Sequence, residues 1–556
     1  MSFLLISCAH QQAPPGGPVD KTAPKIMAVI PQPNSVNVDT TTTVTITFSE
    51  AVDQRSVENA IFISPRQTES VTYKWHGKKV TIRFAEPLKH DRTYVVTIGT
   101  KAQDLRRNPM KDAFHIAFST GNELDNGAIS GRIYGENKPE GIILGAYSLT
   151  DSVPVQPSKS YPEYITQCNA TGEFEFPYMA PGTYQVFAIT DRNANQKYDP
   201  NRESLGIPTT FAELTPQSAM VRGLNFRMTR IDTIAPGVKG VDASDRNHLE
   251  IRFNEDIAPV PDSFLNRHFT VTVETDSLDT LKFRTIYQHS IDHSKFVAVT
   301  VDQRDSTRYV LQANDLTDIS GNMLDTLRDT FAFDAVARAD TSRPALEFQS
   351  IANGKKDVPV KSDLRLVFTE PMNQMSFEQN FSVSDSAKRA IDGTYKWQNP
   401  ADVSFVPDQA LESFMPYKAS VRVDSVFDLF GNAVRDTAIE FTFSTVNVDT
   451  LSALSGNVRD ALDSSAGQFY VAALKLGPDS LRYETVLDSA GPYRLEGLMP
   501  GIYFLEAFRD RDGNGKYSFG QINPFVPAER FVMIQDSIVI RSRWPNEDND
   551  IVIPEH

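Results

Sequence analysis

The chain contains 556 residues, and its 55 basic and 71 acidic side chains give a formal net charge of −16. At roughly 100–150 residues per domain, this length predicts about four or five domains. The acidic balance argues against nucleic acid as the main partner and against docking on anionic lipid, because both need clustered Lys and Arg. No stretch approaches the roughly 18–20 apolar residues of a membrane-spanning helix. A hydrophobic content of 40% favours folded protein over wholesale disorder.

The first residues carry one distinctive motif, Leu5-Ile6-Ser7-Cys8. It resembles a bacterial lipobox, in which the Cys becomes lipidated and forms the mature N-terminus. Residues 13–18 are rich in Pro and Gly and are typical of a flexible tether. The apolar run before Cys8 is shorter than that of a complete export signal, which leaves a start further upstream or a chance match in a cytosolic protein as alternatives. We expect lipidation at Cys8. The other cysteine, Cys168, is expected to be a small buried hydrophobe.

A first repeat occurs three times. Each copy begins with an Asp that has a Pro four residues later, and it continues with a strand that ends in Phe and an acidic residue. A Tyr-centred strand and an Asp-rich turn follow, and the copy ends with a strand of alternating aromatic residues. Strands such as 44–48 and 80–84 alternate apolar and polar residues, which predicts one buried face. Short strands separated by Pro, Gly, Asn and Asp turns predict β-sandwiches of about 100 residues. The recurring acidic positions are Asp20, Glu50, Asp104, Asp232, Glu255, Asp318, Asp340, Glu370 and Asp428.

This order of motifs resembles the bacterial Ig-like domain named after S-layer proteins of the SbsA type. The first copy departs from it at the turn, where Arg107 precedes Asn108 in place of a Gly. The Pro- and Gly-rich leader, with Asp20 and Pro24, is similar to the start of Bacteroidetes envelope lipoproteins that carry this domain. The resemblance implies Ig-like domains at 21–121, 233–338 and 339–447. We expect Glu50, Glu255 and Glu370 to protect turns or sheet edges rather than to bind a ligand.

A second repeat aligns residues 172–198 with 491–517 without gaps. Both copies contain a strand, a Pro-Gly turn and a second strand that begins near a Tyr, Tyr184 or Tyr503. The pattern resembles the prealbumin-like, carboxypeptidase-regulatory-like β-sandwich, which implies non-catalytic spacers at 124–232 and 448–556. With residues 1–20 as lipobox and tether, the sequence predicts an all-β chain of tandem β-sandwich domains. We expect an elongated rod, because each unit buries its own core and touches mainly its neighbours.

The loop after the second strand of this repeat is the best candidate for chemistry. Oxygen-bearing side chains at alternate positions match the first half of a calcium loop, since Ca²⁺ needs several oxygen ligands. The twelfth positions, Arg202 and Gln521, are not the Glu that a helix-flanked calcium loop needs, so a turn held by Asx hydrogen bonds is the alternative. The candidate ligands are Asp510, Asp512 and Asn514 in the second copy and Asp191, Asn193, Asn195 and Asp199 in the first. No other cofactor is expected.

Signals for catalysis are absent from the sequence. It contains no nucleophile elbow, phosphate-binding loop or dinucleotide-binding glycine motif. His289 and His293 have a helical zinc spacing, but in an extended segment they would lie too far apart for one ion. The three tryptophans, Trp75, Trp397 and Trp544, are expected in cores more than on a carbohydrate platform.

These observations predict a non-catalytic lipoprotein of the outer membrane, periplasmic or surface-exposed, that acts as a scaffold, spacer or adhesion module. Its partners would be the membrane, through the lipid, and other envelope proteins or glycans. The alternative is a glycan-binding surface protein that supports polysaccharide capture. An enzyme with a dispersed carboxylate site is a third and weaker reading.

Overall fold

The computed structural model describes residues 20–556 except 68, 150–154, 463–466, 478–479 and 535. Cys8 and residues 1–19 of the predicted tether lie outside the described residues. The rest is all-β, as predicted, and the helices in the described part are short. We name the five predicted ranges unit 1 (21–121), unit 2 (124–232), unit 3 (233–338), unit 4 (339–447) and unit 5 (448–556); these boundaries stay a prediction. The helices are α1 (Gln54–Ala60), α2 (Asp262–His268), α3 (Gln374–Glu378), η1 (Val423–Ser425) and η2 (Val448–Thr450).

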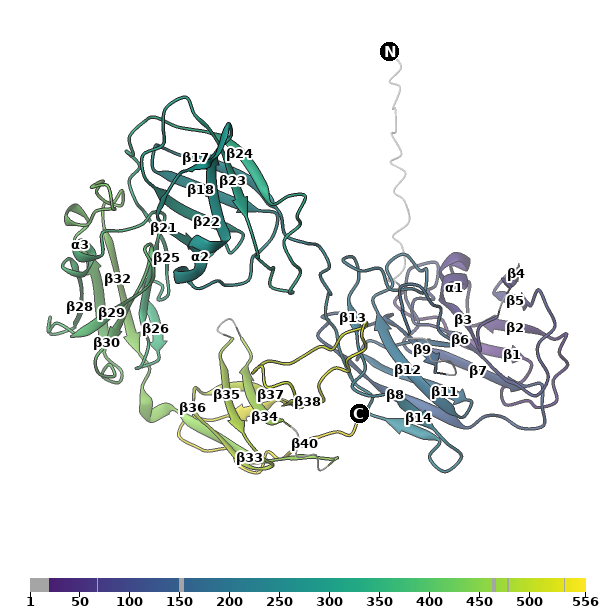
Figure 1. Cartoon of the computed structure of the whole chain (residues 1–556). Helices are drawn as coiled ribbons and strands as arrows, with labels where there is room; N and C mark the ends of the chain where they lie inside the picture. Colours follow the sequence, from purple (N-terminus) through teal and green to yellow (C-terminus); the bar gives the residue numbers. More distant parts are fainter. Residues whose placement is uncertain (1–19, 68, 150–154, 463–466, 478–479, 535) are drawn as a thin grey trace, which may run out of the picture.

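Units 1, 3 and 4 each consist of two sheets, which agree in the four strands of the first and in three strands of the second (Figure 1). Units 3 and 4 add a fourth strand to the second sheet, at opposite edges. Unit 1 pairs its strands in the orders β1-β2-β5-β4 and β3-β6-β7. The corresponding orders are β17-β18-β22-β21 with β20-β19-β23-β24 in unit 3, and β25-β27-β30-β29 with β26-β32-β31-β28 in unit 4. The bounds are β1 (Ile26–Ile30), β2 (Thr43–Phe48), β3 (Ile61–Ser64), β4 (Thr72–His76), β5 (Lys79–Arg83), β6 (Thr93–Ile98), β7 (Phe114–Ser119), β17 (Val238–Ala243), β18 (His248–Phe253), β19 (Phe269–Val273), β20 (Asp276–Thr280), β21 (Phe283–Gln288), β22 (Lys295–Thr300), β23 (Arg308–Ala313), β24 (Thr330–Asp334), β25 (Leu346–Gln349), β26 (Lys355–Val358), β27 (Leu364–Phe368), β28 (Phe381–Asp385), β29 (Gly393–Asn399), β30 (Asp402–Pro407), β31 (Pro416–Val421) and β32 (Ile439–Thr445).

The alternation seen in the sequence places the core of these units. In unit 1, β2 pairs with β5 antiparallel, with Val44 opposite Ile82 and Ile46 opposite Val80. All four side chains are fully buried. Because successive side chains on a strand point to opposite faces, the intervening threonines are left to the other face. Units 3 and 4 contain equivalent separate cores.

The Tyr-centred strand has a structural role that recurs in all three units. The hydroxyl of Tyr94 accepts a hydrogen bond from the backbone N–H of Lys89 at 2.8 Å, and Tyr309 and Tyr417 each accept one from the residue five positions earlier. Each Tyr ring stacks on a Phe of the closing aromatic strand, at centroid distances of 5.5–5.8 Å. The apolar ring is thus buried while its polar tip is satisfied, which fixes the end of each sandwich.

Units 2 and 5 share a different arrangement. Unit 2 has the orders β10-β9-β12-β13 and β11-β8-β15, and unit 5 has β35-β34-β37-β38 and β36-β33-β40. The gapless repeat covers the β11–β12 hairpin and its counterpart β36–β37. The bounds are β8 (Gly127–Tyr134), β9 (Ile143–Ser148), β10 (Tyr164–Gln167), β11 (Glu173–Met179), β12 (Gly182–Ile189), β13 (Leu205–Gly206), β14 (Ala212–Leu214), β15 (Met220–Arg222), β16 (Phe226–Arg227), β33 (Ser452–Asp460), β34 (Gln468–Lys475), β35 (Arg482–Leu487), β36 (Gly491–Leu498), β37 (Gly501–Asp510), β38 (Phe531–Met533), β39 (Ile538–Ile540) and β40 (Ile551–Ile553).

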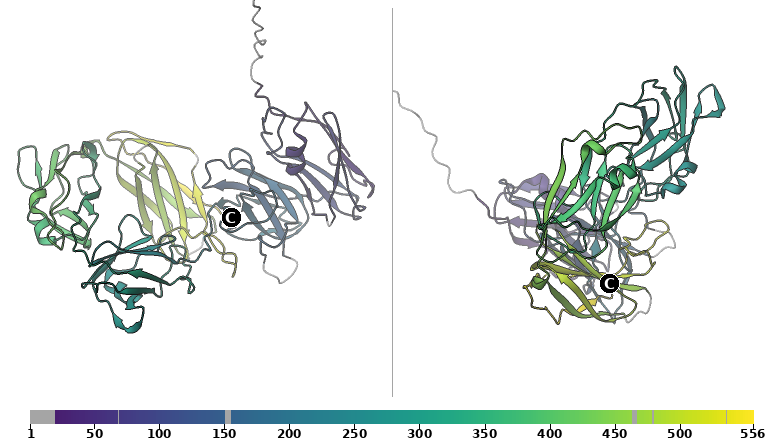
Figure 2. Two further views of the ribbon diagram at one scale, coloured as in Figure 1. Left: turned by 90° about the horizontal axis from the view of Figure 1, so that it is seen from above. Right: turned by 90° about the vertical axis from the view of Figure 1, so that its left-hand side faces the viewer.

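We expected an elongated rod in which each unit touches mainly its neighbours in sequence. That expectation is wrong. Unit 5 folds back and lies beside unit 2, while units 3 and 4 form an arch between them (Figures 1 and 2). A hydrophobic cluster around Phe187 and Leu205 of unit 2 contacts Phe62 of unit 1 and also Ile522 and Phe525 of unit 5. The physical reason is that units 2 and 5 carry apolar loop residues, such as Phe211 and Phe525, that pack against each other and are partly shielded from water there.

Candidate functional site

The contact between units 2 and 5 is built mainly from aromatic side chains. Phe211 of unit 2 stacks on Phe525 of unit 5 at a centroid distance of 5.2 Å, and Tyr134 packs edge-to-face on Phe531 at 5.4 Å. The backbone N–H of Ala528 donates to the carbonyl oxygen of a unit 2 proline, Pro208, at 3.1 Å. Aromatic pairs of this kind contribute beyond their buried area, so the contact is a specific one.

One arginine joins the same two units through charge. The Arg227 guanidinium of unit 2 lies 5.0 Å from the centroid of the Tyr517 ring and 3.6 Å from the Glu506 carboxylate, both in unit 5. Glu506 is buried and also pairs with Arg482 of its own unit at 2.5 Å. A buried carboxylate needs such partners, because an unpaired buried charge is costly. Arg227 therefore compensates a charge that belongs to the other unit.

The recurring acidic residues of units 1, 3 and 4 converge, which the sequence analysis did not foresee. In each unit the Asp of the opening motif, the Glu after the second strand of the first sheet and the Asp of the turn offer oxygen atoms within 4.8 Å of one another. The expectation that the glutamates protect turns or edges misses this grouping. The only signal in the sequence was the joint recurrence of the three positions. The groups are Asp20, Glu50 and Asp104; Asp232, Glu255 and Asp318; and Asp340, Glu370 and Asp428.

The turn aspartate of each group has a structural task. Asp428 accepts hydrogen bonds from the backbone N–H of Asn432 and from its side-chain amide, both at 2.8 Å. Asp104 and Asp318 do the same with Asn108 and Asn322. These are Asx-type bonds that close the turn. The opening aspartate and the glutamate contribute further negative charge to the same place.

Repulsion between the carboxylates of these groups helps to raise the pKa values of two of the glutamates. Burial, reinforced by the charge of Asp232, raises the pKa of Glu255 to about 7. Burial and the charge of Asp340 raise the pKa of Glu370 to about 7. Both effects disfavour the ionised carboxylate, so a nearby positive charge would be stabilising.

The predicted calcium loop of unit 5 is closed by its own hydrogen bonds. Asp510 is buried and accepts from the backbone N–H groups of Gly513 and Gly515 at 2.7 and 2.8 Å. Asp512 accepts from the backbone N–H of Asn514 at 3.1 Å, and the side-chain oxygen of Asn514 accepts from Lys516. The structure thus places the three predicted residues in one loop, with the Asx geometry of the alternative interpretation. Calcium binding there stays a prediction.

Sequence reasoning missed a buried glutamate beneath this loop. Glu529 accepts from the backbone N–H groups of Arg511 and Ser518, and it offers an oxygen within 4.8 Å of those of Asp510 and Asp512. Burial raises the pKa of the Glu529 carboxyl. In unit 2, Glu203 accepts from Arg192 and Asp199 in the same way. The two glutamates fall outside the gapless alignment, which explains why it did not reveal them.

The corresponding loop of unit 2 has a different set of side-chain contacts. Asp191 is buried, burial raises its pKa, and it accepts from the backbone N–H groups of Asn195 and Gln196. The side-chain amides of Asn193 and Asn195 both donate to Asp199, at 2.5 and 3.3 Å. All four predicted residues therefore lie together. The Asp199 carboxylate, which an ion would need as a ligand, already accepts hydrogen bonds from two side-chain amides.

The remaining candidates have structural surroundings. Trp75 and Trp397 are half-buried and donate their indole N–H to Glu58 of α1 and Glu378 of α3. Trp544 is 73% exposed. His289 pairs with Glu347 of unit 4 at 3.0 Å. Cys168 is fully buried next to β10, as expected, and burial raises the pKa of its thiol to about 12.

No helix within the described residues is long and apolar enough to cross a bilayer. No curated protein matches the chain in sequence. Among solved structures, the N-terminal part of the bacterial S-layer protein SbsC is 12% identical, with a TM-score of 0.17. That match covers 38% of this chain and 44% of the SbsC structure, so the chain spans less than half of that relative.

Two further solved structures are similar at the same low level. SbsC domains 1–6 are 11% identical over 93% of this chain and 66% of that one, with a TM-score of 0.16. L,D-transpeptidase 3 from Mycobacterium tuberculosis, in complex with a faropenem-derived adduct, is 15% identical over 26% of this chain and 47% of that one, with a TM-score of 0.15. These values carry no argument about function.

The family comparison is more specific. Residues 20–120 and 340–445 match the model of a bacterial Ig-like domain. The two segments coincide with units 1 and 4. Unit 3 has the same order of strands in its first sheet, without a match of its own. The chain therefore contains bacterial Ig-like domains within an all-β, multidomain architecture.

Proposed function

We propose that this protein is a non-catalytic scaffold of the bacterial cell envelope, anchored in the outer membrane by a lipid on Cys8. The observation that carries the proposal is the assembly of bacterial Ig-like domains and related β-sandwiches into one chain. Function resides in sites rather than in folds, and the sites with the most side-chain contacts in this chain lie between units. A protein whose aromatic and charged side chains hold its units together fits a mechanical or organising role.

The closure between units 2 and 5 supports this role. Independent beads on a string would leave the relative positions of their loops undefined, because interdomain linkers permit motion. Here aromatic packing and the Arg227–Glu506 pair fix unit 5 against unit 2. Loops of different units are thereby held at defined positions, as a platform for other envelope proteins requires.

The test of the proposal is localisation of the native protein with and without Cys8. In the producing bacterium, a chromosomal Cys8→Ala variant is compared with the wild type by membrane fractionation and by mass spectrometry of the N-terminal peptide. We expect an acylated Cys8 and outer-membrane association in the wild type, and release into the soluble periplasmic fraction in the variant. Recovery of the wild type in the cytosol with unmodified Cys8 would contradict the anchor.

Glycan binding is the second candidate, and one observation favours it. Trp544 exposes 73% of its surface beside Arg541, Asn546 and Glu547, the combination of flat ring and polar groups that sugars bind. A glycan array probed with the wild type and with Trp544→Ala tests it. Binding that is lost in the variant supports this function, and an array without hits at high protein concentration removes it.

A further inference from the structure

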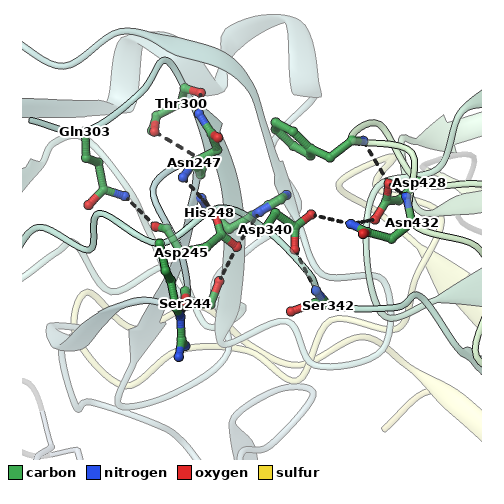
Figure 3. A network of polar contacts seen from close by, with 12 residues as sticks. Ser244, Asp245, Asn247, His248, Thr300, Gln303, Asp340, Ser342, Asp428 and Asn432 are labelled. Carbon is green, nitrogen blue, oxygen red and sulfur yellow. Dashed lines mark hydrogen bonds and ion pairs between the residues drawn. The ribbon is translucent and has the colours of Figure 1, made fainter.

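The junction between units 3 and 4 contains an imidazole that the other carboxylate groups lack. His248 is the first residue of β18 in unit 3, and Asp340 lies in the connection between the units (Figure 3). Glu370 follows β27 of unit 4. Oxygen or nitrogen atoms of Asp245, His248 and Asp340 lie within 4.8 Å of one another. Asp340 also belongs to the acidic group with Glu370 and Asp428. The two sets therefore share Asp340 and span both units.

The His248 ring is held in one orientation. Its Nδ1 lies 2.8 Å from Asp245 Oδ2, and Asp245 Oδ1 is fixed in turn by the backbone N–H groups of Asn247 and His248 at 2.7 and 3.0 Å. The ring also makes a T-shaped contact with Phe430 of unit 4 at a centroid distance of 4.9 Å. An imidazole whose Nδ1–H is donated to a carboxylate presents its Nε2 lone pair outward, which is the arrangement that metal-binding histidines adopt.

That lone pair has no hydrogen-bond partner within the described residues. His248 is only 7% exposed, and its Nε2 is buried. Figure 3 shows the ring lying between Asp245 and Asp340, and Asp340 belongs to the acidic group. Buried polar atoms are almost always satisfied, and an exception calls for a missing water or ion. A second exception lies in the same place, because Glu370 Oε2 is also buried without a partner.

The acidic side of the junction is held for coordination as well. Asp340 accepts hydrogen bonds from the backbone N–H of Ser342 at 2.9 Å and from the Asn432 side-chain amide at 3.0 Å. Each carboxylate oxygen retains a further lone pair after such a bond. Asp340, Glu370 and Asp428 thus concentrate negative charge at this place.

We propose that this junction binds a divalent transition-metal ion of the Zn²⁺ class, with His248 Nε2 and Asp340 as ligands and with Glu370, whose carboxylate lies within 4.8 Å of that of Asp340, as a third ligand that moves in when the ion binds. An imidazole nitrogen combined with carboxylates suits Zn²⁺, whereas Ca²⁺ and Mg²⁺ prefer oxygen ligands alone. Asp245 orients the histidine from behind. Because the ligands come from unit 3, the connection and unit 4, the ion crosslinks two units and fixes the angle between them. The equivalent groups of units 1 and 3 contain carboxylates only.

The experiment is calorimetric titration of the purified chain, stripped with EDTA, with Zn²⁺ and separately with Ca²⁺. We expect one Zn²⁺ site that binds more tightly than Ca²⁺, and a loss of at least tenfold in Zn²⁺ affinity in His248→Gln and in Glu370→Gln. Removing the orienting carboxylate in Asp245→Asn is expected to weaken binding 10–100-fold. His289→Gln is the matched control, since His289 lies at the same junction and contacts Glu347 rather than the acidic group.

Three results would overturn the proposal: no Zn²⁺ binding by the wild type, Ca²⁺ binding tighter than Zn²⁺, or equal weakening in His248→Gln and His289→Gln. Circular dichroism of each metal-free variant checks that the sandwich is intact. X-ray absorption spectroscopy of the zinc-loaded wild type gives a readout that does not depend on any variant. Imidazole scattering with oxygen neighbours supports the site, and an oxygen-only shell rejects it.

Discussion

The contact between units 2 and 5 and the junction between units 3 and 4 join their units by opposite means. The first packs aromatic rings against each other, among them Phe211 on Phe525, and adds one arginine. The second is polar, with His248, Asp245 and Asp340 in one network and Asn399 donating to Ser290 across the junction at 2.8 Å. Apolar contacts depend little on salt or ions, whereas charged ones depend on both. The chain therefore combines a fixed closure with an adjustable joint.

The largest effect is expected from breaking the aromatic closure. Phe525→Ala removes the ring that stacks on Phe211 and packs on the unit 2 cluster. Losing a packed aromatic side chain costs about 3 kcal/mol, which is enough to release unit 5 from unit 2. Small-angle X-ray scattering should show a larger radius of gyration. Phe414→Ala is the control, because Phe414 is 75% exposed in unit 4; equal profiles for the two variants would show that the closure does not depend on this ring.

A half-buried histidine in unit 1, His115, sharpens the comparison because it titrates without an ion-pair partner. Burial lowers the pKa of His115 to about 4, and its Nδ1 lies 2.9 Å from the Thr97 hydroxyl. The folded state binds the proton less well than the unfolded state, so stability is full above pH 6.5 and falls as the pH drops toward 4. The loss should reach about 2–3 kcal/mol.

His115→Gln keeps a polar side chain but cannot titrate, so it should abolish this acid sensitivity. Hydrogen exchange of the β6 and β7 peptides at pH 6.5 and pH 4.5, corrected for the intrinsic pH dependence, measures the effect. The prediction fails if the wild type and the variant lose protection equally.

The loop of unit 5 tests whether an oxygen-only site binds an ion at all. Calcium at several times its dissociation constant should stabilise unit 5 by about 1 kcal/mol, seen as a rise in its melting temperature relative to EDTA. Asp512→Asn should reduce the rise, because it gives the loop the Asn that unit 2 has at Asn193. Identical melting curves with calcium and with chelator would leave the Asx turn as the sole interpretation.

The smallest effect is expected at the edge of the polar junction. Glu347→Gln removes the partner of His289, but the Glu347 side chain is 36% exposed and water screens the pair. The free energy of unfolding should change by less than about 1 kcal/mol, and less still in 1 M salt. Thermal unfolding at low and high salt measures it, and a large salt-independent loss would mean that this pair, rather than the acidic group, holds the junction.

The sequence was sufficient to predict the fold because the signals for it are local. Alternation in β2 and β5 and the Tyr and Phe positions of the closing strands each act within one sandwich, so a single copy of the repeat carries them. The sequence contained a signal for the convergence of Asp340, Glu370 and Asp428, since the same three positions recur in units 1, 3 and 4. Recurrence alone does not show how close in space two positions lie when they are 30 or more residues apart in the sequence.

Other features left no pattern that a sequence could reveal. Phe211 and Phe525 lie in loops with no periodicity, and nothing in either segment indicates that it meets the other. His248 occurs in one unit only, so a search for repeats passes over it. Glu203 and Glu529 follow Asp191 and Asp510 at different spacings, and a gapless alignment separates them. These residues act through contacts between distant segments, which depend on the tertiary structure.

The closure of unit 5 on unit 2 turns a chain with one covalent path into a loop. A pull applied to unit 3 or unit 4 is transmitted to unit 2 along two routes, through the linker to unit 3 and through the aromatic contact with unit 5. The applied force is shared between the two routes, and one of them bears all of it only after the other has broken. The arch would extend in two stages under force, and the first would be the rupture of a non-covalent contact that can form again when the tension falls.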